Sequence, residues 1–87
     1  MYYVYVLVSL KDRRFYVGSS EDLRKRFREH QDGRVASTRG RLPLKLICYE
    51  AYLTKYDALR RERYLKSSDA KKEFRVRFKG TLQILIE

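Results

Sequence analysis

Two runs of tyrosine and valine near the start of the chain constrain its fold more than any other feature. Residues 2–10 and 15–19 are rich in β-branched and aromatic side chains, and only four polar residues separate them. Such runs are typical of strands, and a connection this short can join only antiparallel neighbours. The sequence therefore predicts an antiparallel hairpin. Residues 44–53 have the same character, and we expect this third strand in the sheet centre or beside the first strand.

A helix is predicted directly after the hairpin. Residues 22–31 carry Leu23, Phe27 and His30 at the spacing of one helical face. Ser19 or Ser20 offers a cap for the first turn, and glycine at position 33 is a natural stop.

Two more helices are predicted in the second half of the chain. Lys55–Leu65 follows Thr54 as a cap, and residues 70–79 follow a serine-rich break and should end at Gly80. Residues 80–87 form a short apolar tail, for which an extra strand and a helical turn are both open. We expect one domain over residues 1–79, with the tail packed on it.

The charge balance indicates a polyanionic partner. The 87 residues include 21 basic and 11 acidic side chains, a net charge of +10. The electrostatic field of such a charge attracts nucleic acid first and an anionic membrane surface second. The simplest alternative interpretation is that the charge only keeps the protein soluble. Eight tyrosines interleave with the cations, and no long amphipathic helix has the wide apolar face that membrane binding requires. We therefore favour nucleic acid and expect no membrane association.

The sequence also indicates the cellular compartment in which we expect the protein. The single cysteine, Cys48, excludes an internal disulfide framework and suits the reducing cytoplasm. Met1 leads straight into the first strand without a signal-peptide pattern, and no apolar run approaches the roughly 20 residues that span a bilayer.

Glu62 is the sharpest single indication of chemistry. It follows Ala58 by four residues and precedes Leu65 by three, so it shares the apolar face of the predicted helix. A carboxylate there needs a partner or a metal. On spacing alone, an ion pair is the better interpretation, and Arg26 would serve as the partner.

Arg26 and His30 lie on the first predicted helix. A guanidinium can grip a phosphate with two parallel hydrogen bonds, although a surface arginine is the simpler interpretation. His30 could bind phosphate or pass a proton, or it could complete the edge of the core. Since it is the only histidine, a multi-histidine zinc site is excluded.

Tyr5 and Tyr16 lie on neighbouring strands, so their hydroxyls could meet over one face of the sheet. A free tyrosine has a pKa of about 10, too high for a good base at neutral pH, but nearby cations favour the phenolate. The alternative is that both rings only pack the sheet.

Together, these strings resemble the GIY-YIG nuclease family, and the likeness is closest to small single-domain members similar to the nuclease domain of excinuclease C. It covers roughly residues 2–79. Residues 3–5 (Tyr-Val-Tyr) and 16–18 (Tyr-Val-Gly) match the first two motifs. Residues 22–30, 41–50 and 58–66 match the first helix, the third strand with its lead-in, and the helix with the glutamate.

The resemblance implies an α+β fold with a three-stranded antiparallel sheet flanked by about three helices, in the order β-β-α-β-α-α. It also implies one divalent metal on Glu62, usually Mg²⁺, with Mn²⁺ as a substitute. Tyr5 would be the general base and Tyr16 a supporting hydroxyl. Arg26 would hold the scissile phosphate with assistance from His30.

The expected activity is hydrolysis of phosphodiester bonds, in DNA more readily than in RNA, with low sequence specificity or direction by substrate structure. Cations of the first helix and of the following loop would contact the nucleic-acid backbone: Arg24, Lys25, Arg28, Arg34, Arg39 and Arg41. A non-catalytic nucleic-acid-binding module and a protein-interaction domain are the alternatives, and a protein partner is unknown.

Two positions depart from the family pattern. Tyr3 stands where the first motif has glycine, and the asparagine that many members carry after the glutamate helix is missing, because the chain contains no asparagine.

Overall fold

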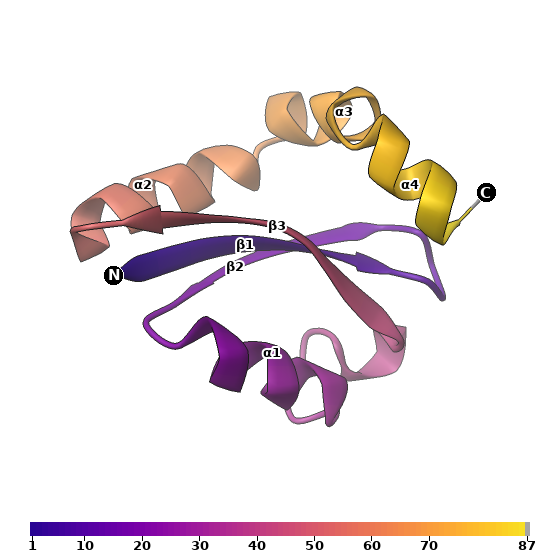
Figure 1. The fold of residues 1–87 in the computed structure, drawn as a ribbon, viewed down its shortest axis with the longest axis horizontal. Helices are drawn as coiled ribbons and strands as arrows, with labels where there is room; N and C mark the ends of the chain where they lie inside the picture. The colour runs from indigo at the N-terminus through magenta and orange to yellow at the C-terminus, as the bar shows by residue number, and fades with distance from the viewer. Residues whose placement is uncertain (87) are drawn as a thin grey trace.

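The computed structural model describes residues 1–86, in which one antiparallel sheet separates two layers of helix (Figure 1). The strands are β1 (Tyr2–Ser9), β2 (Phe15–Ser20) and β3 (Leu44–Tyr52), in the order β2-β1-β3. This confirms the predicted α+β class and antiparallel pairing. It also places β1 in the centre of the sheet and β3 at an edge beside it.

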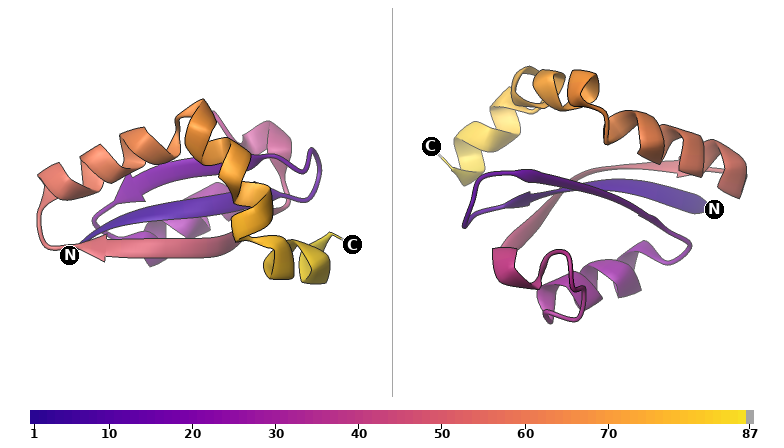
Figure 2. Two further views of the ribbon diagram at one scale, coloured as in Figure 1. Left: turned by 90° about the horizontal axis from the view of Figure 1, so that it is seen from above. Right: turned by 180° about the vertical axis from the view of Figure 1, so that it is seen from behind.

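The two helical layers differ in size (Figure 2). Helix α1 (Leu23–Gln31) and a short 3₁₀ turn (Arg39–Arg41) lie on one side of the sheet. Three helices follow one another over the other side: α2 (Lys55–Leu65), α3 (Ser68–Arg77) and α4 (Lys79–Leu85). None of the helices in the described residues has the length and apolarity that crossing a bilayer requires.

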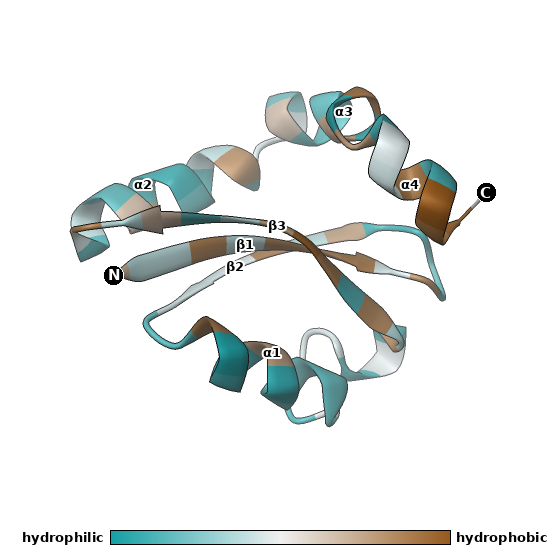
Figure 3. Ribbon diagram, viewed as in Figure 1, coloured by the Kyte–Doolittle hydropathy of each residue, from teal (hydrophilic) through white to brown (hydrophobic). Residues whose placement is uncertain are grey.

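The strand period of two divides the central strand between two cores. Val4, Val6 and Val8 pack toward α2, α3 and α4, whereas Tyr5 and Leu7 pack toward α1. Hydrophobic residues accordingly concentrate on the strands and in α4, while α1 is mostly hydrophilic (Figure 3). The smaller core leaves room for polar side chains between α1 and the sheet.

Two helix boundaries differ from the prediction. Asp22, not Ser19 or Ser20, caps α1 by accepting from the Lys25 amide at 3.1 Å, since Ser20 instead bonds the backbone of Asp22. The predicted stop holds, because Gly33 adopts a φ of +74° just past the end of α1.

The predicted helix over residues 70–79 is α3, which begins two residues earlier at Ser68 and ends at Arg77, and the tail forms a separate helix, α4. Phe78 ends α3 and begins α4, so Gly80 lies inside a helix rather than ending one. The break turns both Phe78 and Leu82 into the larger core, where they join Phe74. The apolar tail is therefore helical as far as Leu85.

Candidate active site

Tyr5, Tyr16 and His30 form an aromatic cluster between α1 and the sheet. Tyr5 and Tyr16 come from neighbouring strands and face α1, and His30 in the last turn of α1 lies against both. The His30 ring centroid is 5.6 Å from that of Tyr5 and 5.2 Å from that of Tyr16, and the two tyrosine rings are 6.4 Å apart. The structure thus brings these three predicted residues together.

Gly18 makes this cluster possible. It is the pairing partner of Tyr5 in the β1–β2 ladder. A Cβ atom at this position would lie 2.6 Å from Cζ of Tyr5 and closer still to the hydroxyl oxygen. Any side chain would therefore displace the Tyr5 ring. The string at residues 16–18 supplies one phenol and makes room for the other.

A chain of buried hydrogen bonds runs from Tyr5 through His30. The Tyr5 hydroxyl lies 2.8 Å from Nε2 of His30, and Nδ1 lies 2.7 Å from Oγ1 of Thr38. The Thr38 hydroxyl donates to the Val35 carbonyl at 3.5 Å, so it accepts from Nδ1–H, and Nε2 is left to accept the Tyr5 proton. This network favours the tautomer with the proton on Nδ1.

Burial determines the protonation of the pair. It raises the pKa of Tyr5 to about 12, although the Arg26 side chain acts in the opposite direction. Burial also lowers the pKa of His30 to about 4, and the positive charge of Arg26 adds to this effect. At neutral pH the histidine is uncharged and Tyr5 holds its proton. His30 has no exposed surface, so it meets Tyr5 and Thr38 and not the solvent.

Arg26 lies at the open edge of this cluster. Its guanidinium interacts with the Tyr5 hydroxyl, and this contact is the main reason that the pKa of Arg26 is raised. It also pairs with Glu29 at 3.3 Å, an i,i+3 contact on the partly exposed side of α1. The guanidinium thus meets solvent on one side and the phenol on the other.

Glu62 approaches from the opposite face of the sheet. It shares a face of α2 with the buried residues Ala58 and Leu65, as its spacing predicts, and its side chain is 17% exposed. Ser19, on the edge strand β2, donates to Oε1 at 2.9 Å. The negative charge of Glu62 contributes to raising the pKa of Tyr5, as the weakest of the effects on that hydroxyl.

The ion-pair partner of Glu62 differs from the predicted one. Lys66, one turn further along α2, lies 3.0 Å from Oε2, whereas Arg26 pairs with Glu29. The lysine side chain is 51% exposed, and exposed i,i+4 pairs contribute only about 0.3–0.5 kcal/mol. This ion pair is therefore weak enough for another cation to displace.

The donors around Glu62 suit a magnesium ion that carries most of its own ligands. The carboxylate and the Ser19 hydroxyl are hard oxygen donors. Within residues 1–86 no group of three or more His, Cys, Asp and Glu side chains gathers, so the protein supplies no complete metal cage. Mg²⁺ is commonly bound through one or two carboxylates, with water and substrate phosphate completing the shell. The residues thus fit such an ion and do not fit a structural zinc site.

The predicted backbone-contacting cations are distributed unevenly. Five of them are exposed on α1 and the loop that follows: Arg24, Lys25, Arg28, Arg34 and Arg39. Arg41 is different, since its Nε lies 2.7 Å from Oδ2 of Asp12 in the β1–β2 turn. It fastens the loop to the hairpin, and its Nη2 also donates to the Phe15 carbonyl at 3.4 Å.

Sequence reasoning did not predict three polar partners of the site. Thr38 favours one His30 tautomer, while Ser19 and Lys66 both hold Glu62. Only Lys66 carries a local signal, the i,i+4 spacing from Glu62. The other two contacts join residues from separate elements.

Comparison with known proteins identifies the family. The model of the GIY-YIG catalytic domain matches residues 1–75. A UPF0213 protein of Haloquadratum walsbyi is 38% identical over 81 residues, which are 92% of this chain and 90% of that protein. UPF0213 protein YazA of Bacillus subtilis is 39% identical over 70 residues, or 79% of this chain and 71% of YazA.

A solved structure agrees with this assignment. The solution NMR structure of the UPF0213 protein BH0048 from Bacillus halodurans matches with a TM-score of 0.56 and 38% identity, over 92% of this chain and 87% of that one. The resemblance seen in the motifs is thereby confirmed: the chain belongs to the GIY-YIG family.

Proposed function

We propose that the chain is a metal-dependent endonuclease that hydrolyses DNA phosphodiester bonds, with low sequence specificity or direction by substrate structure. One observation carries this proposal. Tyr5, Tyr16 and His30 pack together between α1 and the sheet, with Arg26 at the edge of the cluster, and Ser19, the neighbour of the Tyr5 pairing partner Gly18, holds Glu62. Phenol, guanidinium and carboxylate groups on either side of one edge strand are the types of group that the cleavage of a phosphodiester requires.

Arg26 is the proposed phosphate ligand. Its guanidinium is partly exposed and stands beside Tyr5, so a phosphate bound there lies next to the phenol. Two parallel N–H···O bonds would orient the scissile group and stabilise the charge that develops in the transition state. The Glu29 pair must open or share the guanidinium when the phosphate binds.

Tyr5 is the proposed proton acceptor, and His30 makes that role possible. The phenol keeps its proton at neutral pH, so it can accept one from water only by releasing its own. His30 Nε2, 2.8 Å away, is unprotonated and receives that proton. The water oxygen attacks phosphorus as the proton moves through Tyr5, the bond from phosphorus to the leaving sugar oxygen breaks, and that oxygen takes up a proton from water. His30 afterwards returns its proton through Tyr5, and a bound phosphate offsets the Arg26 charge that disfavours imidazolium. Tyr16 supplies a second hydroxyl beside this path.

Glu62 and Ser19 are the proposed metal-binding residues. A Mg²⁺ ion, or Mn²⁺ in its place, would supply Lewis acidity at the phosphate. Glu62 would release Lys66 to hold the metal ion, since the exposed lysine can turn into solvent.

Exposed cations on α1 and the following loop would hold the flanking nucleic-acid backbone without reading its sequence. We propose that the substrate is DNA rather than RNA because of the family resemblance. We propose a cytoplasmic location because Cys48 is a free cysteine.

A non-catalytic nucleic-acid-binding module is the second candidate. Both carboxylate oxygens of Glu62 already have partners, which favours this candidate: Oε1 accepts a hydrogen bond from Ser19 and Oε2 pairs with Lys66. In that case Glu62 would fasten α2 to the edge strand, and the positive charge alone would hold nucleic acid.

Nicking of supercoiled plasmid in the presence of Mg²⁺ tests the two candidates. We expect the wild-type chain to nick the plasmid and Glu62→Gln to lose about 10²–10³-fold in rate, the usual effect of removing one transition-state electrostatic contact. Glu73→Gln is the matched control, because Glu73 is an exposed carboxylate on α3 outside the site. It should nick at the wild-type rate.

The other outcomes are equally informative. Equal nicking by the wild type and Glu62→Gln would mean that a contaminating nuclease cuts the plasmid, and would refute the proposed nuclease activity. If neither nicks but both bind with a steep salt dependence, the binding module is correct.

A further inference from the structure

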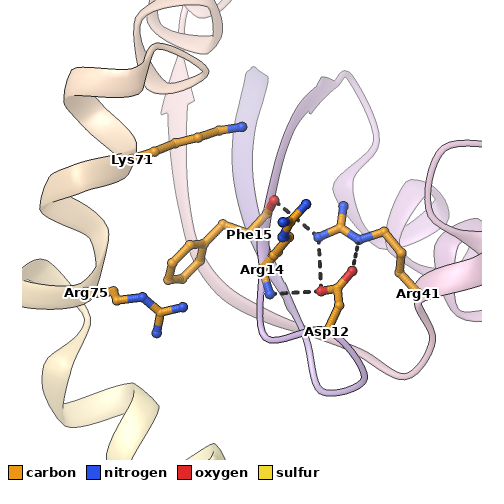
Figure 4. A pocket seen from close by; sticks show the side chains of 6 residues that line it. All are labelled: Asp12, Arg14, Phe15, Arg41, Lys71 and Arg75. Carbon is orange, nitrogen blue, oxygen red and sulfur yellow. Dashed lines mark hydrogen bonds and ion pairs between the residues drawn. The ribbon is translucent and has the colours of Figure 1, made fainter.

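A positively charged pocket lies at the far end of the β1–β2 hairpin, away from the aromatic cluster. It encloses about 510 Å³ between the hairpin turn and α3 (Figure 4). We call it the hairpin pocket, and its lining residues are Asp12, Arg14, Phe15, Arg41, Lys71 and Arg75. Four of these six side chains are cationic, so the pocket suits an anion.

The one carboxylate among these lining residues is already neutralised. Arg41 holds Asp12 through two contacts, Nε to Oδ2 at 2.7 Å and Nη2 to Oδ1 at 3.4 Å. Hydrogen bonding to Arg41 lowers the pKa of Asp12 to about 2. The Asp12–Arg41 pair thus stays formed at neutral pH, and the positive charge of the pocket comes from Arg14, Lys71 and Arg75.

No carboxylate in the described residues competes with a ligand for these three cations. Among residues 1–86, none of them forms an ion pair with an acidic side chain. Lys71 and Arg75 lie one turn apart on α3 and extend toward the hairpin (Figure 4). Arg75 donates to the Arg13 carbonyl at 3.2 Å and stacks over the Phe15 ring at 5.9 Å, so its guanidinium is held in place before any ligand arrives.

Strand β2 links the pocket to the proposed catalytic site. Phe15 lines the pocket at the beginning of β2, and Ser19 binds Glu62 near its end, both on the α2–α4 side of the sheet. Four residues of strand span about 13 Å. Because β2 is an edge strand, a chain running along it would pass both places.

We propose that the hairpin pocket binds a second backbone phosphate of the nucleic acid whose cleavage is proposed above. This inference rests on the proposed function, since it names a further contact with the same substrate. Phosphate is the group that unpaired guanidinium and ammonium donors prefer. A nucleic-acid backbone is favoured over a small phosphorylated ligand because the net charge of +10 attracts polyanions, and Phe15 alone among the described lining residues is uncharged.

Equilibrium binding in EDTA tests the proposal without requiring catalysis. The double variant Lys71→Ala/Arg75→Ala is compared with Lys72→Ala/Lys79→Ala, which removes the same charge from exposed positions outside the pocket. Anisotropy of a labelled DNA duplex is followed from about 50 to 200 mM salt. Each lost phosphate contact should make the slope of log K against log salt shallower by about 0.9, and weaken binding about eightfold at 0.1 M salt.

We expect the pocket variant to show this loss and the control to bind more nearly like the wild type. Equal loss in the two double variants would overturn the proposal, because charge alone would then explain it. A second result would also overturn it. In that result, the wild type binds inorganic pyrophosphate saturably and the pocket variant does not, yet the pocket variant binds the duplex as tightly as the control does. None of these outcomes depends on nicking, so a chain that binds but does not cut still tests the pocket. Arg14→Ala, which leaves the Arg75 contacts to the hairpin intact, repeats the test if the double variant is unstable.

Discussion

At the scale of single residues, His30 links the candidate site to stability. Its folded-state pKa is about 4, against 6.5 for a free histidine. Between these values the unfolded chain takes up a proton that the folded chain refuses, so the free energy of unfolding decreases as pH falls. We expect a loss of about 3 kcal/mol from pH 6.5 down to 4, measured by urea denaturation at stepped pH.

The matched variant is His30→Gln, which cannot titrate but keeps an amide that can hydrogen-bond Tyr5 or Thr38. The carboxylates of the chain contribute equally to both proteins, so the difference between their pH profiles isolates the histidine. An identical profile for the two proteins would contradict the burial of His30. So would an imidazole NMR titration with its midpoint near 6.5.

At the scale of elements, α4 gives the clearest expectation. Leu82 is 7% exposed and packs in the larger core, whereas Ile84 on the same helix is 85% exposed. Leu82→Ala should lower the free energy of unfolding by about 2 kcal/mol, the low end for a buried leucine because a terminal helix can relax. Ile84→Ala should change it by less than about 0.5 kcal/mol. Equal effects in urea denaturation would mean that α4 does not pack as described.

Elements with a strong local pattern were predictable from the sequence, and those decided by packing were not. Lys55–Leu65 matches its prediction at both ends, because Thr54 caps it and its apolar spacing is regular. The α3–α4 break has no glycine or proline at the point of turning, which is Phe78. What sets it is the burial of Phe78 and Leu82 against Phe74, a tertiary contact that no local pattern records.

At the scale of the whole molecule, the same distinction applies to the candidate site. The motif order predicts Tyr5, Tyr16, Arg26, His30 and Glu62 as one group, and strand alternation places the two phenols on one face. The contacts of Ser19 with Glu62 and of Thr38 with His30 span element boundaries. They depend on how α2 crosses the edge strand and how the loop after α1 folds back, which a sequence read element by element does not specify.

Binding and cleavage should separate over the molecule, because the cations are spread widely while the proposed chemistry depends on one carboxylate. Affinity for nucleic acid depends on the number of phosphates neutralised, and Glu62 neutralises none. In EDTA, Glu62→Gln should therefore bind duplex DNA as tightly as the wild type or slightly more tightly, with the same salt slope. Anisotropy from about 50 to 200 mM salt measures both.

A changed slope in Glu62→Gln would contradict this separation, provided that circular dichroism shows the fold intact. The cause would be either that Lys66, released from its pair with residue 62, had become a new phosphate contact, or that the edge strand had rearranged. The double variant Glu62→Gln/Lys66→Ala distinguishes these cases. If the released lysine is the cause, its removal restores the original slope. If the cause is a rearranged edge strand, where Ser19 has lost its carboxylate partner, the altered slope persists.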